Sequence, residues 1–387
     1  MACRGQSSQG YATAFDPVLS SASLYCRGAV EESRVSEGFE KVTVRRVSRR
    51  RLLEWGGASL SLLAASCGGD DATVIDSAAP QGPDELEPIT PTEDFYVVAH
   101  FGMADVDAET WSLSITRGGE VLGSLSYSDL SALAPREREH TLQCIESRPG
   151  WVRMSNGLFE GLPLPEVLDS LGIDWKEGST HLGFRCADFY TVGLPLEVED
   201  PPWLVWRMNG ETLPKKHGFP ARILAPNRYG WLNPKQVEEV ELRNTPLEIP
   251  WVEELEAYAD AVGLHEESDL FAEDIQIQTV VVHPSSMQFV ESGTGIRILG
   301  KAFGGRDPVV VVEISQDGGE TYSEAELTYA PGRDRWTLWR HVWRPQRVGT
   351  HLIHVRCRSE SGLRTEEEYP ENRIPYVGGM WLLVEVL

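Results

Sequence analysis

The first residue pattern in this chain that could support redox chemistry is a cysteine inside a strand-like run. Cys144 ends the segment Thr-Leu-Gln-Cys and is followed two positions later by Glu146. A cysteine thiolate is a soft ligand that suits a redox metal. A single cysteine in such a run is more often a small buried apolar residue. Taken alone, Cys144 therefore leaves both interpretations open.

A second pattern places three groups that can hold an anion around a loop rich in glycine and proline. These groups are His217, Arg222 and Lys235, and residues 217–222 read His-Gly-Phe-Pro-Ala-Arg. A guanidinium can hold a phosphate with two parallel hydrogen bonds, and an ammonium adds a point charge. Small residues in the loop let backbone N–H groups approach the same anion. Each residue alone also fits a solvated turn, but together they predict an anion site.

These segments together resemble the sulfite oxidase family of molybdopterin enzymes. The most specific part of the resemblance is Met-Asn-Gly at residues 208–210, followed by the segment 217–222 and then by Lys235. The resemblance extends from about residue 89 to the C-terminus. It implies a molybdenum cofactor that carries the redox chemistry, while the protein binds and orients it.

The resemblance also implies roles for individual residues. The metal would be held by the pterin dithiolene and by the thiolate of Cys144. Asp188, in an Asp-Phe-Tyr run, lies about where the family has a cofactor-contacting acid, and the segment Phe95–His100 matches an early cofactor-contacting segment. The cofactor-binding residues predicted in this way are Tyr96, His100, Asp188, His217, Arg222 and Lys235.

The departures from the family pattern concern the substrate. Sulfite oxidases usually carry an arginine where this chain has Val98, and a Gly-Asn-Arg-Arg-like run after the cysteine. Here only Arg148 keeps a cation in that run, and Glu146 adds an opposing charge. A charged hydrogen bond is worth about 1.5–3 kcal/mol, so these changes should weaken oxyanion binding. Tyr258 is the candidate for the family's active-site tyrosine, although its neighbours match poorly. Cys144, Arg148 and Tyr258 are thus the predicted catalytic residues.

Three functions remain open from the sequence. The first is two-electron oxygen-atom transfer by a molybdoenzyme, nominally from sulfite to sulfate. The second is reduction of a sulfoxide or another oxygenated compound, although the related methionine-sulfoxide reductase subunits usually lack the C-terminal β region. The third is a tethered, non-catalytic binding protein on the same fold. The substrate of an enzyme would be a small oxyanion or a sulfur compound. Because the sequence has no haem, flavin or nicotinamide motif, electrons would need a separate acceptor such as a cytochrome.

The region that must position these residues, residues 89–250, is predicted to be α+β. Trp111–Ile115 alternates apolar and polar residues as a half-buried strand does, and Tyr127–Leu133 and Pro165–Leu171 are expected to form short helices. No regular β-α-β alternation and no Gly-x-Gly-x-x-Gly motif follows a strand, so a dinucleotide fold has no support. The fold class expected is therefore a sulfite-oxidase-type mixed domain.

A connector at residues 251–272 leads to a region, residues 273–387, that is predicted to be all-β. Residues 309–314 form an apolar run that leads to the hairpin signal Asp-Gly-Gly at 317–319. Short strands with turn signals over about 100 residues suggest an immunoglobulin-like sandwich. By its resemblance this region is a dimerisation domain, which predicts a homodimer.

Charge and cysteine content restrict the class of partner. The chain has 387 residues and a formal net charge of -24, from 59 acidic and 35 basic residues, which argues against nucleic acid as a partner. No Cys-x-x-Cys pair is present, so structural zinc and covalent haem are not expected. Among the six cysteines of the chain, Cys186 and Cys357 are expected to be inert buried thiols. The cysteines are Cys3, Cys26, Cys67, Cys144, Cys186 and Cys357.

The N-terminal part resembles an export leader. A basic cluster that includes Arg49 and Arg50 precedes a short apolar run, residues 55–66, which favours a twin-arginine-type signal over residues 45–67. Cys67 ends a lipoprotein-like cleavage box and is a possible lipid anchor, although cleavage without lipid also fits. Residues 68–88 are then predicted to be a flexible linker. Residues 1–44 form an extension that a start site assigned too far upstream would explain. The predicted location is the periplasm or the cell envelope.

Overall fold

The computed structural model describes residues 83–196, 200–253, 272–365 and 375–387. The predicted leader, its Cys67, the extension before it and most of the predicted linker lie outside these residues. All described residues belong to a single compact unit of the chain. Within them, no helix is long and apolar enough to cross a membrane. The boundaries expected near residues 250 and 273 stay predictions.

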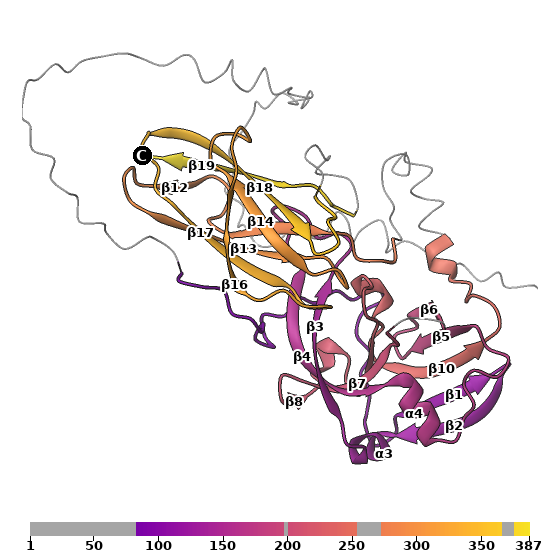
Figure 1. Ribbon diagram of the computed structural model, residues 1–387. Coiled ribbons are helices and arrows are strands. Elements are labelled where there is room, and N and C mark those ends of the chain that lie inside the picture. Colours follow the sequence, from indigo (N-terminus) through magenta and orange to yellow (C-terminus); the bar gives the residue numbers. More distant parts are fainter. Residues whose placement is uncertain (1–82, 197–199, 254–271, 366–374) are drawn as a thin grey trace, which may run out of the picture. The chain divides into compact units, whose positions relative to one another are not determined.

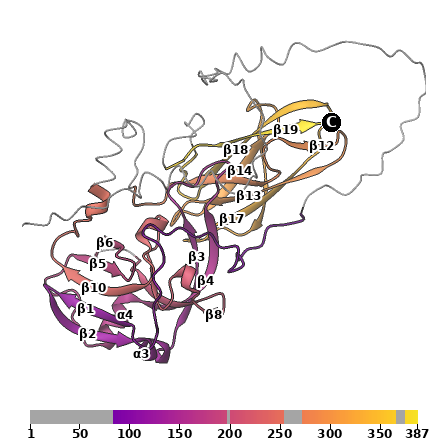
Figure 2. The same cartoon turned by 180° about the vertical axis from the view of Figure 1, so that it is seen from behind.

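The first region is built from two sheets. In one, the strand order is β2-β1-β10-β5-β6, with β1 parallel to β10 and the other neighbours antiparallel. In the other, the order is β3-β4-β7-β8, and β9 also pairs with β7. Figure 1 shows these as two groups of strands, and Figure 2 shows them from behind. The strands are β1 (Ser112–Arg117), β2 (Glu120–Ser126), β3 (Arg136–Gln143), β4 (Met154–Pro163), β5 (His181–Cys186), β6 (Thr191–Pro195), β7 (Trp203–Met208), β8 (Glu211–Thr212), β9 (Arg222–Leu224) and β10 (Val237–Arg243).

The helices of this region are short, and local sequence explains where they begin. Helix α3 (Tyr127–Ala132) starts after Ser126, whose side chain accepts from the Asp129 backbone while the Asp129 carboxylate accepts from the Ser126 backbone. Helix α4 (Leu164–Ser170) has a proline in its first turn, where the missing N–H costs nothing. The 3₁₀ helices are η1 (Lys215–His217) and η2 (Gly230–Leu232). The expected mixed fold is confirmed, with strands outweighing helices.

The second region is the expected β-sandwich. Its first sheet has the order β11-β13-β17-β16, and its second has the order β12-β19-β18-β14-β15. The apolar side chains between the sheets form one core, which includes Val280, Val312 and Trp339. The strands are β11 (Gln278–His283), β12 (Gln288–Val290), β13 (Ile296–Phe303), β14 (Val309–Ser315), β15 (Ser323–Glu324), β16 (Glu326–Tyr329), β17 (Thr337–Trp343), β18 (Gly349–Ser359) and β19 (Met380–Val386).

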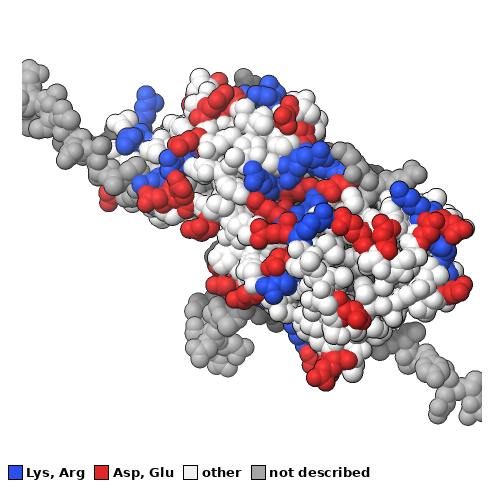
Figure 3. Space-filling model, turned by 60° about the horizontal axis from the view of Figure 1, so that its bottom comes forward, with Lys and Arg blue, Asp and Glu red and all other residues white. Residues whose placement is uncertain are grey.

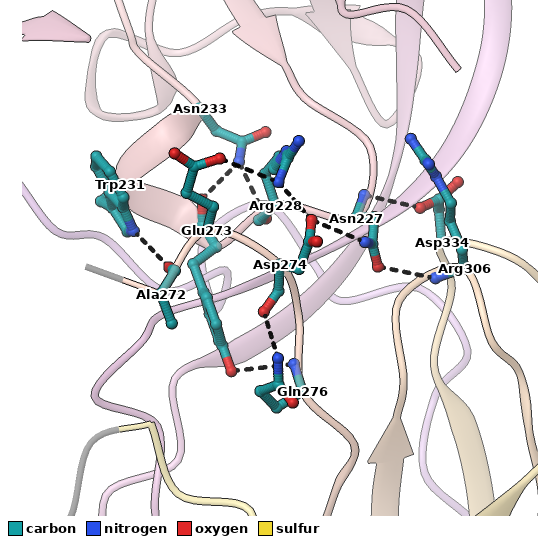
Figure 4. Close-up of polar contacts among 11 residues, drawn as sticks. Asn227, Arg228, Trp231, Asn233, Ala272, Glu273, Asp274, Gln276, Arg306 and Asp334 are labelled. Atoms are coloured by element: carbon teal, nitrogen blue, oxygen red, sulfur yellow. Dashed lines mark hydrogen bonds and ion pairs between the residues drawn. The ribbon is translucent and has the colours of Figure 1, made fainter. Parts of the chain in front are cut away.

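Polar and apolar contacts join the two regions. Figure 4 shows Asn227 between Asp274 and Asp334: its side chain donates to the Asp274 carboxylate at 3.1 Å, and its backbone N–H donates to the Asp334 carboxylate at 3.0 Å. Asp334 also pairs with Arg138 of β3 at 2.9 Å. Met154 and Tyr229 of the first region share an apolar cluster with Trp336 and its neighbours in the second. The two regions therefore support each other.

Candidate functional site

The first region contains a cavity of about 290 Å³ that brings together seven of the nine predicted site residues. Its walls come from the segment before β1, the end of β3, the β5–β6 turn, η1, β9 and the loop that contains η2. The predicted residues that line it are Tyr96, His100, Cys144, Asp188, His217, Arg222 and Lys235.

Cys144 follows the last residue of β3, where the strand turns. Its backbone N–H donates to the Arg153 carbonyl and its own carbonyl accepts from Ser147, both at 2.9 Å, which closes a tight turn. The thiol is free and only 9% of the residue is exposed. Burial raises the pKa of the Cys144 thiol, and the nearby Glu146 carboxylate adds to this. Gly230 leaves the space beside it, because a Cβ there would lie 2.8 Å from the Tyr96 hydroxyl.

At another part of the cavity lie a buried arginine and a half-buried lysine, and no carboxylate among the described residues is bonded to either. Arg222 is 4% exposed and donates to the carbonyls of His217 and Asn233, both at 3.1 Å, while its Nε has no partner among the described residues. Lys235 donates to the Val98 carbonyl at 2.8 Å and to that of Lys216 at 3.3 Å. Desolvation lowers the pKa of Arg222 to about 10, and desolvation with the Arg222 charge lowers that of Lys235 to about 8. Both positive charges therefore favour a bound anion.

His217 completes this cationic end as a neutral group. Its Nε2 lies 3.0 Å from the Thr92 carbonyl, so Nε2 carries the proton and donates it. Burial lowers the pKa of His217 to about 4, which keeps the imidazole uncharged at neutral pH. Gly218 has φ +114°, and a Cβ there would lie 3.0 Å from the Arg222 Cβ and 3.1 Å from the Lys235 Cβ. Glycine is thus what lets the two cations approach.

An aromatic wall forms a further part of the cavity. Tyr190 stacks on Trp251 with ring centroids 5.1 Å apart, and the Trp231 ring meets Trp251 edge-on at 6.3 Å. The His100 ring lies 4.8 Å from that of Trp251. The Tyr190 hydroxyl donates to the Trp231 carbonyl at 2.8 Å, so the wall is held by hydrogen bonds as well as by stacking. Asp188 also lines the cavity, and its carboxylate accepts a hydrogen bond from the Tyr190 backbone N–H at 3.1 Å.

The two remaining predicted residues are not placed in the cavity. Arg148 does not line it, and its guanidinium lies 5.3 Å from the Trp151 ring. Tyr258 lies outside the described residues. Their catalytic roles stay predictions. Glu146 does line the cavity, and it pairs at 3.1 Å with Arg153, whose guanidinium lies 3.8 Å from the Trp151 ring.

Sequence reasoning did not single out several residues that shape this site. Arg153 lies nine positions beyond Cys144 and reaches Glu146 only because β3 and β4 pair antiparallel. Trp231 and Asn233 belong to the segment before Lys235, and the run Tyr-Gly-Trp-Leu-Asn-Pro at 229–234 was a signal that could have identified them. Trp251 had no local signal, since it comes to the cavity through contacts with Tyr190 and Trp231.

These residues fit a molybdenum cofactor. Buried cations are normally paired, so Arg222 and Lys235 without carboxylate bonds match the phosphate of a pterin. Cys144 supplies one soft sulfur donor, and the absence of a side chain at Gly230 leaves room beside it. The buried orphan Nε of Arg222 offers one more donor to an anion.

Comparison with known proteins points to the same group. Residues 100–251 match the model of the oxidoreductase molybdopterin binding domain, and residues 270–360 match that of the Mo-co oxidoreductase dimerisation domain. The fold is similar to that of the sulfane dehydrogenase SoxCD from Paracoccus pantotrophus. The TM-score is 0.66 at 19% identity, and the match covers 78% of this chain and 82% of that one.

Curated relatives are more similar in sequence. Mitochondrial sulfite oxidase of Rattus norvegicus is 29% identical over 286 residues, which is 65% of this chain and 52% of the relative. Sulfite oxidase of Arabidopsis thaliana is 27% identical, over 63% of this chain and 72% of the relative. A protein of Azospira oryzae named for methionine-sulfoxide reduction is 27% identical over 54% of this chain. The chain spans about half the length of the mammalian relatives it matches. It belongs to the sulfite oxidase family of molybdopterin-dependent oxidoreductases.

Proposed function

We propose that this protein is a molybdenum-cofactor oxidoreductase that catalyses two-electron oxygen-atom transfer. One observation carries the proposal: the buried free thiol of Cys144, the buried Arg222 and the half-buried Lys235 line the same cavity, and neither cation is bonded to a carboxylate of the described residues. A binding protein without the cofactor would have no use for cations held in this way, because desolvating a charge against carbonyl groups alone costs free energy. This makes the non-catalytic alternative the least supported.

Each residue has a distinct part in holding the cofactor. Arg222 and Lys235 would bind its phosphate. His217 would stay uncharged and would hold the loop in place through its hydrogen bond to the Thr92 carbonyl. Cys144 would be the protein ligand to molybdenum. Burial raises the pKa of its thiol in the free protein, and ligation would require the deprotonated thiolate. When bound, the cofactor supplies the two-electron redox chemistry.

Sulfite is the nominal substrate. Its oxidation takes the oxygen of one water and releases two protons and two electrons as sulfate forms. The similarity to sulfite oxidases supports this reaction. A separate one-electron carrier, such as a cytochrome, would take the electrons. Arg148 and Arg153 are the two cations that follow Cys144 within nine positions and could attract the substrate, although the Arg153 guanidinium pairs with Glu146.

A second candidate is reduction of a neutral oxygenated compound such as a sulfoxide. The Glu146 carboxylate in the cavity disfavours a dianion, and the wall formed by Tyr190 and Trp251 suits an apolar body. Val98 stands where sulfite oxidases usually have arginine. The similarity to the Azospira protein supports this interpretation.

The two reactions can be measured on the same preparation. Purified protein would be assayed for sulfite oxidation with ferricyanide and for sulfoxide reduction with a reduced viologen dye. The proposal expects at least one activity, lost together with molybdenum in Cys144→Ser. Cys357→Ser, which removes a buried thiol of the second region, is the control and should keep both. Unchanged molybdenum content and activity in Cys144→Ser would refute the assignment.

We also propose that the protein is exported through a twin-arginine signal, possesses a lipid anchor at Cys67 and forms a homodimer. The Arg49-Arg50 pair and the lipoprotein-like box support the first two, and the match to a dimerisation domain supports the third. Changing Arg49 and Arg50 to lysine should trap the protein in the cytoplasm. Cys67→Ala should release it from the membrane fraction.

Sedimentation at micromolar concentration should give twice the monomer mass, and a monomer would refute the dimer.

A further inference from the structure

The strand that leads to Cys144 is held by the second region as well as by its own sheet. The Thr141 backbone N–H donates to the Asp334 carbonyl at 2.8 Å, and the Thr141 hydroxyl accepts from the Trp336 backbone at 2.9 Å. Thr141 is buried and also donates to the Asn156 side chain at 2.8 Å. The end of β3 before the cysteine is therefore held by the second region as well as by Asn156 of the first.

Gln278 of β11 forms hydrogen bonds to residues on both sides of Cys144 in the sequence. Its Nε2 donates to the Ser147 carbonyl at 2.8 Å and to the Tyr376 carbonyl at 2.9 Å. Its Oε1 accepts from the Gln143 side chain at 3.2 Å. One buried amide thus binds the residue before the cysteine and the residue that closes the turn after it. Movement of the Cys144 backbone would have to break at least one of these bonds.

This arrangement is costly as a purely structural device. Gln143 and Gln278 are both nearly inaccessible, and the Gln143 Oε1 has no hydrogen-bond partner among the described residues. An unsatisfied buried polar atom destabilises the folded state, and two apolar side chains of the same size would avoid this cost. An arrangement that sacrifices stability next to a functional residue points to a positional role.

We propose that Gln278 is a positioning residue that fixes the Cys144 backbone for its role as metal ligand. It acts across the two regions through Gln143 and Ser147. The second region then has a part in building the site in addition to any part in dimerisation. This inference rests on the proposed function for the ligand role, but the restraint on Cys144 itself can be tested without any cofactor.

The test uses full-length apoprotein from cells that cannot make the cofactor. Alkylation of each cysteine by iodoacetamide is followed by mass spectrometry in wild type, Gln278→Met and Gln143→Met. Methionine is similar in size to glutamine and makes none of these hydrogen bonds. The control is Gln276→Met, which changes an exposed glutamine two positions away whose side chain donates to the Asp274 carbonyl. Cys186 and Cys357, both buried, report general loosening.

The proposal expects Cys144 to react at least several-fold faster in Gln278→Met and Gln143→Met, with Cys186, Cys357 and the control variant unchanged. No increase at Cys144, or an equal increase at Cys186 and Cys357, would overturn it. In protein made with the cofactor, Gln278→Met should also alter the Mo(V) electron paramagnetic resonance signal and lower kcat more than it changes KM. A wild type that lacks molybdenum would refute the proposed function, whereas a Gln278→Met signal identical to wild type would refute only this inference.

Discussion

At the scale of single residues, the cavity is defined by charges that lack the usual partners. Arg222 and Lys235 bind carbonyl oxygens, which are weaker partners for a buried cation than a carboxylate. The free protein therefore carries an electrostatic strain that an anion would relieve. That strain should be measurable as a dependence of stability on pH.

Lys235 gives the first prediction. Its pKa is about 8 in the folded apoprotein and higher when unfolded, so the unfolded chain binds more protons between these values. Apoprotein stability should thus rise as the pH increases from about 8 towards 10.5, on the order of 2 kcal/mol. Urea unfolding of wild type and Lys235→Met at both ends of this range would measure it. The rise should be smaller in the variant, and Lys176→Met, at an exposed site, should keep it. Equal rises in wild type and Lys235→Met would contradict the prediction.

Glu146 gives a second prediction, concerning the substrate. Its carboxylate lines the cavity and occupies Arg153, so Glu146→Gln should free that guanidinium and remove a repulsive charge. If sulfite is a substrate, its KM should fall about tenfold with kcat little changed, equivalent to about 1.4 kcal/mol. Steady-state kinetics would test this. The control is Glu160→Gln, which breaks the Arg207–Glu160 pair and leaves the cavity unchanged. A KM for sulfite that stays constant or rises would count against the inhibitory role of Glu146.

At the scale of elements, the approach of β9 to the segment after η2 depends on one glycine. Gly218→Ala would place a Cβ 3.0 Å from the Arg222 Cβ and 3.1 Å from the Lys235 Cβ, and would add strain at φ +114°. We predict that this variant folds but loses most of its cofactor, measured as molybdenum per chain. Gly210→Ala is the matched control, because Gly210 also has a positive φ but faces open space.

Both substitutions carry a backbone penalty of about 1 kcal/mol, so strain alone cannot separate them. Thermal unfolding of the two apoproteins would verify that the penalties are comparable. Normal cofactor content in Gly218→Ala, or an equal loss in Gly210→Ala, would contradict the prediction. It would show that cofactor binding does not depend on the space that Gly218 leaves between Arg222 and Lys235.

The elements also show how far sequence reasoning reached. The alternation in β1, the helices α3 and α4 and the turn after β14 were all predictable, because each depends on neighbours in sequence. In β18, apolar and polar residues alternate, and Ile353 and Val355 face the core, but His354 on the opposite face is buried against Trp381, a residue of another strand. The pattern indicated the face but could not reveal what covers it.

The site divides in the same way. The cationic loop could be predicted because Arg222 and Lys235 lie within one short segment that resembles a family motif. The aromatic wall and the Glu146–Arg153 pair could not, because they form only when strands pair and distant segments meet. Gln278 had no signal at all, since its partners Gln143 and Ser147 are more than 100 positions away in sequence.

At the scale of the whole molecule, one face of the described surface can be judged for its charge. On the face shown in Figure 3, acidic and basic side chains lie in small interspersed groups, and no single basic surface is visible. The full chain carries a formal net charge of -24, and the exclusion of nucleic acid as a partner stays a prediction. The two described regions are joined at Asp334 by an ion pair with Arg138 and by a hydrogen bond from the Asn227 backbone.

Asp334 gives a prediction at this scale. Its carboxylate pairs with Arg138 and accepts from the Asn227 backbone, and its side chain is 4% exposed. Asp334→Asn keeps the shape but removes the charge, while Arg138 keeps its second partner, Asp200. We expect a loss of about 2 kcal/mol in the free energy of unfolding, measured by denaturant titration. Glu166→Gln, which breaks an exposed pair with Arg136, should cost less than about 1 kcal/mol. Equal losses in the two variants would mean that the buried contact between the regions stabilises the fold no more than an exposed ion pair does.

Whether the cavity holds a molybdenum cofactor is decided by the molybdenum and pterin content of the purified, folded protein. The protein would be made in cells that synthesise the cofactor, with metal measured by mass spectrometry and pterin by fluorescence after oxidation. We predict about one molybdenum and one pterin per chain, with both strongly reduced in Arg222→Met because the phosphate loses its buried partner. A wild-type protein that contains neither would contradict the proposed function, and the roles assigned to Cys144, Arg222 and Lys235 would lose their basis.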